Sequence, residues 1–360
     1  TAAENGHRVL LLERQSRVGR KLLATGNGRC NLSNRNLTPK NYHGENAGFC
    51  EYALSRFGPE QTLAWFRALG LLTAAEESGR VYPVSDSANS VVDVLRLALA
   101  QRENVELRAG CEVQALRKKR GKFEVVLPEE TLTGEAVIVC AGGCAGGKLG
   151  GTELGYRLLE GMGHHRTRLC PALVQLRTDT TYVRALKGVR CDARVTYRVP
   201  GTAEERRGEV QFTDYGLSGI CIMQLSGHLA PGRGPKRPAV ELDLFPMLDE
   251  TALTALFAAR VPLLPGKAPA DFWTGLLNPK LGRALWAAAK LPEKPVDTLP
   301  DAAWQVLANA AKHWLFEGLT PCGWKQAQTT GGGLSLTEVT PSFQFKGCPG
   351  LYFVGETLDC

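Results

Sequence analysis

Two short apolar runs, each ending in glycine, constrain the fold most strongly. Glu135–Gly143 reads EAVIVCAGG, and Gly350–Asp359 reads GLYFVGETLD. A continuous apolar run is typical of a parallel strand buried on both faces, and small residues at its end let a ligand approach the backbone. A tight strand-to-helix turn explains the first pair of glycines equally well. Together the runs predict an α/β fold with ligand chemistry at the carboxyl ends of strands.

The first half of the chain alternates strands with helices. Apolar residues at helical spacing predict helices over Gly58–Leu69 and Ser90–Gln101, and Arg8–Glu13 is expected to be a strand. Strand-like runs over Glu112–Leu116 and Phe123–Leu127 predict an inserted antiparallel meander. The pattern favours an α/β unit that is interrupted by insertions.

Beyond about residue 169 the pattern changes to short β segments separated by Gly- and Pro-bearing turns, which predicts a barrel-like or sandwich domain. Asp249 is expected to cap a helix over Asp249–Val261. Further helices are expected over Leu281–Ala289 and Ala302–Phe316. The predicted domains are a first part of the α/β domain (1–168), a β-barrel-like domain (169–248), a helical insertion (249–325) and a return to the α/β domain (326–360).

Composition excludes several classes of protein. The longest apolar runs are far too short for a membrane span. None of the eleven cysteines forms a C-x-x-C pair, so we expect reduced thiols, no metal site and a cytoplasmic location. The net charge of +7 suits nucleic acid or anionic ligands but is also common elsewhere. The basic run Arg117–Lys122 is expected to be a solvated hairpin tip, with a phosphate-binding patch as the alternative. His164 and His165 are expected at the surface or at a helix end.

An acid at a strand end is the first sign of a nucleotide site. In a dinucleotide-binding unit the second strand ends in an acid that binds the adenosine ribose, about 20 residues after a G-x-G-x-x-G loop. Glu13 occupies such a position, but only 12 residues precede it, so that loop is not in this sequence. Alone, Glu13 fits a simple strand terminator better.

Six motifs spread along the chain together resemble one family. The signature motif is GRKLLATGNGRCNLSN at Gly19–Asn34. Their order and spacing resemble the bacterial HI0933-like family of FAD-binding flavoproteins, also described as BaiN-type or aminoacetone-oxidase-type. The other motifs are GRVYPVSDSANSVVDVL (Gly79–Leu95), CPALVQL (Cys170–Leu176), FTDYGLSG (Phe212–Gly219), AQTTGGGLSLTEV (Ala327–Val339) and GLYFVGETLD (Gly350–Asp359).

The resemblance implies an FAD domain of the two-dinucleotide-binding type, interrupted by a barrel-like and a helical domain. It implies that Glu13 holds the adenosine ribose, that Arg20 and Lys21 line the adenosine and pyrophosphate, and that the backbone of Val113 faces the adenine. The loop 26–31 would lie beside the flavin, 141–143 would close over the nucleotide, and the end of the last strand would contact the pyrophosphate and ribitol. The further FAD-binding residues implied are Arg14, Arg29, Cys30, Asn31, Ala141, Gly142, Gly143, Gly355, Glu356 and Asp359.

The sequence departs from the family pattern in two respects. The family's ESK tripeptide is replaced by QFK at Gln344–Lys346. The glycine-rich first strand and the helix expected after Asp359 are absent from this sequence, and both supply N–H groups to a pyrophosphate. We therefore expect this stretch of chain to bind FAD poorly on its own, although the parent protein binds it.

The resemblance predicts redox chemistry without naming a substrate. We expect an FAD-dependent oxidoreductase that reduces a C=C or C=O group, or oxidises an amine, of a small organic molecule, with NAD(P)H as an external hydride donor. Cys30, Asn31 and Tyr215 are the catalytic candidates, although a packing role for Cys30 and a turn-forming role for Tyr215 are the stronger interpretations. The alternatives are a flavin-dependent enzyme that reduces uridine in ribosomal RNA, for which RNA is the partner, and a non-catalytic flavin-binding scaffold.

Overall fold

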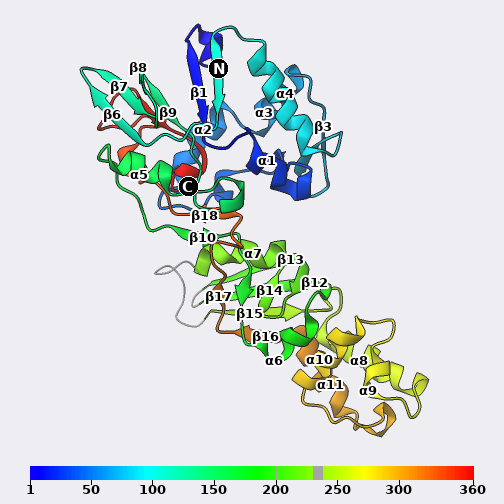
Figure 1. The fold of residues 1–360 in the computed structure, drawn as a ribbon. Coiled ribbons are helices and arrows are strands. Elements are labelled where there is room, and N and C mark those ends of the chain that lie inside the picture. The colour runs from blue at the N-terminus through cyan, green and yellow to red at the C-terminus, as the bar shows by residue number, and fades with distance from the viewer. Residues whose placement is uncertain (200–201, 230–237) are drawn as a thin grey trace. The chain divides into compact units, whose positions relative to one another are not determined.

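The structure, a computed structural model, describes residues 1–199, 202–229 and 238–360. The chain divides into two compact units (Figure 1). Unit 1 contains Thr1–Leu169 and Thr329–Cys360, and unit 2 contains Cys170–Gln328. The domain boundaries expected from the sequence lie after residues 168 and 325. The barrel-like and helical segments, expected as separate domains, lie together in unit 2.

Two parallel strand pairs form the central part of unit 1. Strand β1 (Val9–Glu13) pairs with β5 (Val105–Ala109), and β9 (Val137–Val139) pairs with β19 (Leu351–Phe353). The two apolar runs of the sequence thus lie side by side although more than 200 residues separate them, as the green and red strands show in Figure 1. Both are shorter than expected, because the backbone leaves the strand before the glycines that follow.

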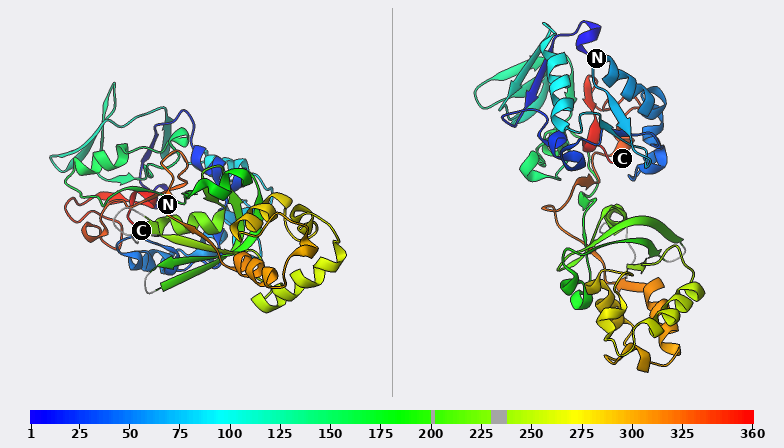
Figure 2. Two further views of the ribbon diagram at one scale, coloured as in Figure 1. Left: turned by 90° about the horizontal axis from the view of Figure 1, so that it is seen from below. Right: turned by 90° about the vertical axis from the view of Figure 1, so that its right-hand side faces the viewer.

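Two small antiparallel sheets and short helices complete unit 1 (Figure 2). Only Arg120 and Gly121 turn between the basic strands β6 and β7, both with positive φ, so most of the expected hairpin tip is strand. The strands are β2 (Ser33–Asn34), β3 (Thr73–Ala75) and β4 (Arg80–Pro83) in one sheet, and β6 (Ala115–Lys119), β7 (Lys122–Val126) and β8 (Thr131–Gly134) in the other. The helices are α1 (Arg20–Ala24), α2 (Cys50–Arg56), α3 (Pro59–Ala68), α4 (Ala88–Ala100) and α5 (Leu154–Glu160).

Unit 2 is built on an antiparallel sheet of seven strands in the order β16-β15-β12-β13-β14-β11-β17. In β12, Ala193, Val195 and Tyr197 are buried and alternate with more exposed residues, as expected of a strand with one face on a core. Among the described residues the edge strands β16 and β17 do not pair, so the sheet is open rather than barrel-like. The strands are β11 (Leu176–Arg177), β12 (Arg190–Val199), β13 (Thr202–Phe212), β14 (Gly216–Ser218), β15 (Ala239–Asp243), β16 (Trp314–Glu317) and β17 (Thr320–Pro321).

Helices share one hydrophobic core with this sheet, which explains why the sheet needs no closure. Asp249 caps α8 as expected, accepting the Ala252 amide at 2.7 Å. The helix expected over Ala302–Phe316 ends at Lys312, because Trp314 and Phe316 point into the core as alternate residues of β16. The helices are α6 (Thr180–Val183), α7 (Ile220–Gln224), α8 (Glu250–Arg260), α9 (Pro269–Phe272), α10 (Pro279–Ala288) and α11 (Ala302–Lys312).

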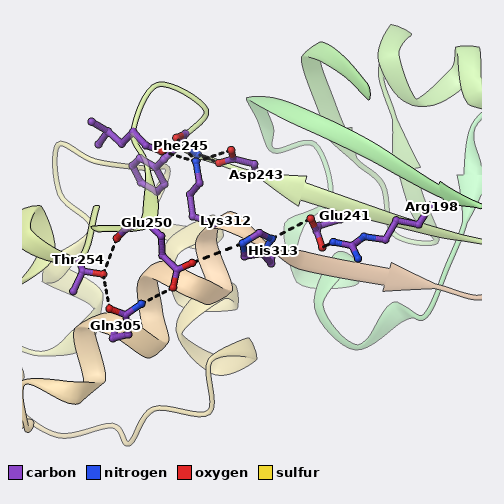
Figure 3. A network of polar contacts seen from close by, with 10 residues as sticks. Arg198, Glu241, Asp243, Phe245, Glu250, Thr254, Gln305, Lys312 and His313 are labelled. Carbon is purple, nitrogen blue, oxygen red and sulfur yellow. Dashed lines mark hydrogen bonds and ion pairs between the residues drawn. The ribbon is translucent and has the colours of Figure 1, made fainter. Parts of the chain in front are cut away.

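A polar network joins the helices of unit 2 to its sheet (Figure 3). The Lys312 ammonium at the end of α11 donates to Asp243 Oδ2 at 2.7 Å and to the carbonyls of Phe245 and Leu248 at 3.1 and 2.5 Å. Both charged side chains are nearly buried, so their pairing satisfies groups that could not face the core alone. Next to them, His313 lies 3.1 Å from Glu241.

None of the eleven cysteines, all within the described residues, forms a disulfide, as the sequence predicts. No helix within the described ranges is long and apolar enough to cross a membrane. Nor do the described His, Cys, Asp and Glu residues gather into a group able to hold a metal ion. His164 differs from expectation, since it is buried with its ring between Phe345 and Phe353.

Candidate functional site

The carboxyl ends of β9 and β19 form the centre of the site. The parallel register places Val139 beside Phe353, so the following segments 140–143 and 354–357 leave the same edge of the sheet. Gly142 and Gly355 have φ angles of 70° and 75°, and a Cβ added at either would meet no atom within 4 Å. Both residues therefore adopt a backbone conformation that favours glycine. Both also border open space, where a ligand can approach their backbone.

Glu356 is anchored by groups from two distant segments. Its Oε1 accepts the Thr330 amide at 2.8 Å, and its Oε2 pairs with the Lys21 ammonium. Gly143 packs against the same group, because a Cβ there would lie 2.2 Å from Thr330 Oγ1 and 2.9 Å from Glu356 Oε1. The Lys21 charge is thus balanced by a carboxylate within the protein.

Two buried groups support this segment from within unit 1. The Tyr156 hydroxyl donates to the Glu356 carbonyl at 3.3 Å, and burial raises the pKa of Tyr156 well above its ordinary value. Asp359 is only 1% exposed, and its amide donates to the Leu334 carbonyl at 3.2 Å. The carboxyl group of Asp359 therefore lies inside the unit, and its role toward a ribitol stays a prediction.

The loop after β1 is held in place by its own polar residues. Glu13 Oε1 accepts the Gln15 amide at 2.7 Å, and no described residue donates a hydrogen bond to Glu13 Oε2. Arg20 donates to Gln15 Oε1 at 2.5 Å and to the Lys148 carbonyl at 3.1 Å. Arg14 donates to the Gly150 carbonyl at 2.9 Å. The half-buried Glu13 thus keeps one acceptor oxygen for a hydroxyl pair such as a ribose.

The loop expected beside the flavin stores backbone strain. Gly26, Asn27, Gly28 and Cys30 all have positive φ, and Asn27 and Cys30 are not glycine. Such strained residues cost of order 1 kcal/mol each and cluster at ligand sites. The conformation therefore supports a functional role for the loop.

The side chains of this loop point in different directions. Cys30 is 1% exposed in a small apolar core, and burial raises the pKa of its thiol, which favours the packing interpretation over a reactive thiolate. Arg29 stacks on the Tyr82 ring at 3.9 Å and pairs with Glu76 at 3.2 Å. The Arg29 charge is therefore balanced by a carboxylate of the protein. The Asn31 side chain, in contrast, is exposed.

Three further residues expected in the site remain to be placed. Ala141 is exposed in the segment 140–143 that follows β9, whereas Val113 is half-buried between β5 and β6. Tyr215 belongs to unit 2, where its hydroxyl donates to Gln175 Oε1 at 2.6 Å. Sequence reasoning missed Gln15 and Tyr156, because their roles depend on partners distant in the sequence and no local pattern marks them.

The residues present fit an FAD. Gly142 and Gly355 offer approachable backbone at the carboxyl ends of parallel strands, which is where open α/β sheets bind ligands. Glu13 offers the acceptor oxygen that a ribose requires. The site could therefore hold the nucleotide part of the cofactor through backbone groups and one carboxylate.

Comparison with known proteins gives the same picture. The model of the family described as HI0933-like protein Rossmann domain matches residues 1–360, which confirms the resemblance and the Rossmann-like fold class. A 3-dehydro-bile acid delta(4,6)-reductase of Clostridium scindens is 35% identical over 98% of this chain and 86% of its own length. A ribosomal RNA dihydrouridine synthase of Escherichia coli is 28% identical over 99% of this chain and 87% of its own. Among solved structures, the FrdA chain of E. coli quinol fumarate reductase is 15% identical with a TM-score of 0.45, covering 99% of this chain and 62% of that one.

Proposed function

Because the chain belongs to the HI0933-like family, we propose that this FAD-dependent oxidoreductase reduces a carbon–carbon double bond conjugated to a carbonyl group of a small organic molecule. The observation that carries the proposal is the pair of strand ends where Gly142 and Gly355 lie next to open space. The relative from C. scindens supports the choice of substrate class, since its name describes reduction of double bonds in a 3-oxo compound.

The residues of unit 1 would bind and orient the cofactor. Glu13 would accept hydrogen bonds from the ribose, and the backbone of Gly142 and Gly355 would contact the phosphate and ribitol groups. Glu356, fixed by Lys21, would hold the second of these segments in place. Bound flavin supplies the hydride chemistry, and a reduced nicotinamide nucleotide would serve as the external donor. The eleven cysteines, none of which forms a disulfide, support a cytoplasmic enzyme.

The test uses the full-length protein. We expect it to be purified with bound FAD, to be reduced anaerobically by NADH or NADPH, and then to be reoxidised by a steroid 4-en-3-one but not by the saturated 3-ketone. A protein without flavin absorbance would refute the cofactor assignment. If neither ketone reoxidises the reduced flavin but another class of oxidant does, the proposed substrate class is refuted and the assignment as an FAD-dependent oxidoreductase stands.

The basic hairpin of β6 and β7 favours a second function, reduction of uridine in ribosomal RNA. Arg117, Lys119, Arg120 and Lys122 are exposed on this hairpin. The relative from E. coli supports this alternative at lower identity. Phosphate contacts make binding strongly salt-dependent. Binding of ribosomal RNA by the holoenzyme at low salt, weakened by changing these four residues to glutamine, would favour this function, and no binding at low salt would remove it.

A further inference from the structure

The glycines of the segment 329–333, which reads TTGGG, bring a threonine to the ends of β9 and β19. A Cβ added at Gly333 would lie 2.5 Å from the Leu358 carbonyl carbon and 2.6 Å from the Asp359 amide nitrogen. Only glycine therefore lets the chain pass so close to the backbone that follows β19. This path places Thr330, in β18 (Thr329–Gly331), within hydrogen-bond distance of residues that follow both strands.

Thr330 is held by two segments of the site. Its backbone N–H donates to Glu356 Oε1 at 2.8 Å, and its side-chain Oγ1 accepts the Ala145 amide at 3.1 Å. Ala145 is fully buried, so its amide requires such an acceptor within the protein. Gly143 lies directly against the same side chain, because a Cβ added at Gly143 would be 2.2 Å from Thr330 Oγ1. The hydroxyl oxygen is therefore fixed beside the segment 140–143 before any ligand binds.

The Thr330 hydroxyl keeps its hydrogen for a ligand. A hydroxyl group has one hydrogen to donate besides the lone pairs with which it accepts. The buried Thr357 uses its hydrogen within the protein, since it donates to the Gly142 carbonyl at 3.3 Å. In contrast, the Thr330 hydroxyl acts only as an acceptor, and no residue of the described ranges accepts a hydrogen bond from it. Because Thr330 is only half-buried, a bound molecule can reach this donor.

We propose that Thr330 is a cofactor-binding residue, whose hydroxyl donates a hydrogen bond to an oxygen of the ribitol and pyrophosphate chain of FAD. This inference rests on the cofactor of the proposed function. The chain is rich in oxygen acceptors, and the proposed function assigns it to Gly142 and Gly355, in the segments 140–143 and 354–357 that Thr330 touches. A donor that the protein already holds in place loses little conformational entropy when the cofactor binds.

The test measures release of FAD without turnover. The full-length holoenzyme is diluted in steps, and the fluorescence of the released FAD gives the dissociation constant. Thr330→Val keeps the shape of the side chain and the backbone bond to Glu356 but removes the hydroxyl group. We expect this variant to bind FAD about 3- to 30-fold more weakly, the effect of one hydrogen bond to a neutral or charged oxygen. Thr330→Ser retains the hydroxyl group and should restore most of the affinity.

A purely structural role of Thr330 would give a different result. Loss of the acceptor for the Ala145 amide lowers the thermal midpoint of the protein freed of FAD, but by itself it leaves the rise of the midpoint on adding FAD unchanged. We expect Thr330→Val to reduce that rise as well. The control is Thr329→Val, since the Thr329 side chain is exposed and should leave the FAD affinity unchanged.

The possible outcomes separate this inference from the proposed function. Unchanged FAD affinity in Thr330→Val, or a loss that Thr330→Ser does not reverse, would overturn the role of the hydroxyl group while the FAD assignment stands. A wild-type protein that holds no FAD would refute the cofactor and this inference together. FAD affinity that depends on Thr330, in a protein that reduces no enone, would keep the inference and refute only the proposed substrate class.

Discussion

Replacing Lys312 with methionine tests whether the nearly buried ion pair of Figure 3 stabilises unit 2. The substitution keeps an unbranched side chain of similar length but removes three hydrogen bonds. One of them joins the ammonium to Asp243, and two join it to the carbonyls of Phe245 and Leu248. Asp243 would keep only its bond from the Phe245 amide at 2.9 Å, so a carboxylate with 9% exposure would lose its counter-charge.

The expected cost follows from that exposure. Removing one partner of a buried ion pair costs about 3–5 kcal/mol, because the remaining charge stays buried. The Lys312 side chain is 12% exposed, so some water reaches the pair and we expect the lower end, about 3 kcal/mol. Lys187→Met is the matched control. Its pair with Asp214 is 69% and 45% exposed, and exposed pairs contribute less than about 1 kcal/mol.

The assay is equilibrium unfolding in urea, followed by tryptophan fluorescence. Of the six tryptophans only Trp65 lies outside unit 2, so the signal reports mainly on that unit. A second variant, Lys312→Met with Asp243→Asn, should recover part of the loss, since it removes the unpaired charge. If Lys312→Met lowers the free energy of unfolding by less than about 1 kcal/mol with an unchanged denaturant slope, the pair does not stabilise the unit as argued.

Three further predictions concern individual positions. Burial lowers the pKa of His164 below its ordinary value near 6.5, so the stability contributed by its neutral ring is complete above about pH 6.5 and is lost as the pH falls. His164→Gln should flatten this pH dependence, measured by the hydrogen exchange of β19. A pH dependence as steep as that of the wild type would contradict the prediction. Gly143→Ala should lower the FAD content of the full-length protein, because the added Cβ would meet Thr330. Gly147→Ala is the control, since its added Cβ meets no atom within 4 Å. Equal FAD content in the two variants would refute the packing argument. Gly282→Ala would place a Cβ 2.1 Å from Trp273 Cγ and should destabilise unit 2 by about 1–3 kcal/mol in urea unfolding, and an unchanged midpoint would show that Trp273 can move.

The elements that the sequence predicted well are those whose pattern is local. The apolar runs that became β9 and β19 indicate parallel strands by their own composition, and their glycines require a backbone that other residues avoid. The expected burial on both faces was wrong for β9, because Ile138 is 55% exposed. Likewise the Asp249 cap depends only on the amide three residues later. The end of α11 was missed, because only the pairing of Trp314–Glu317 with β15 decides that this segment is strand.

Side-chain partners could not be predicted in the same way. Nothing near Glu356 in the sequence indicates Lys21, which is 335 residues distant, and nothing near Arg29 indicates Glu76. The burial of His164 depends on Phe345 and Phe353, which reach it only after the chain returns from unit 2. Such contacts are properties of the tertiary structure, and a single sequence without its fold contains no local signal for them.

The basic residues of the first motif have partners within the protein that the sequence did not indicate. The resemblance implied that Arg20 and Lys21 line the adenosine and pyrophosphate and that Arg29 binds FAD. In the structure Arg20 donates to Gln15 and a carbonyl, Lys21 pairs with Glu356, and Arg29 pairs with Glu76. These residues hold the loops around the strand ends in place. We therefore expect a phosphate bound there to rely mainly on backbone N–H groups, so that the glycine geometry, more than the number of basic residues, would determine whether the site can hold a cofactor.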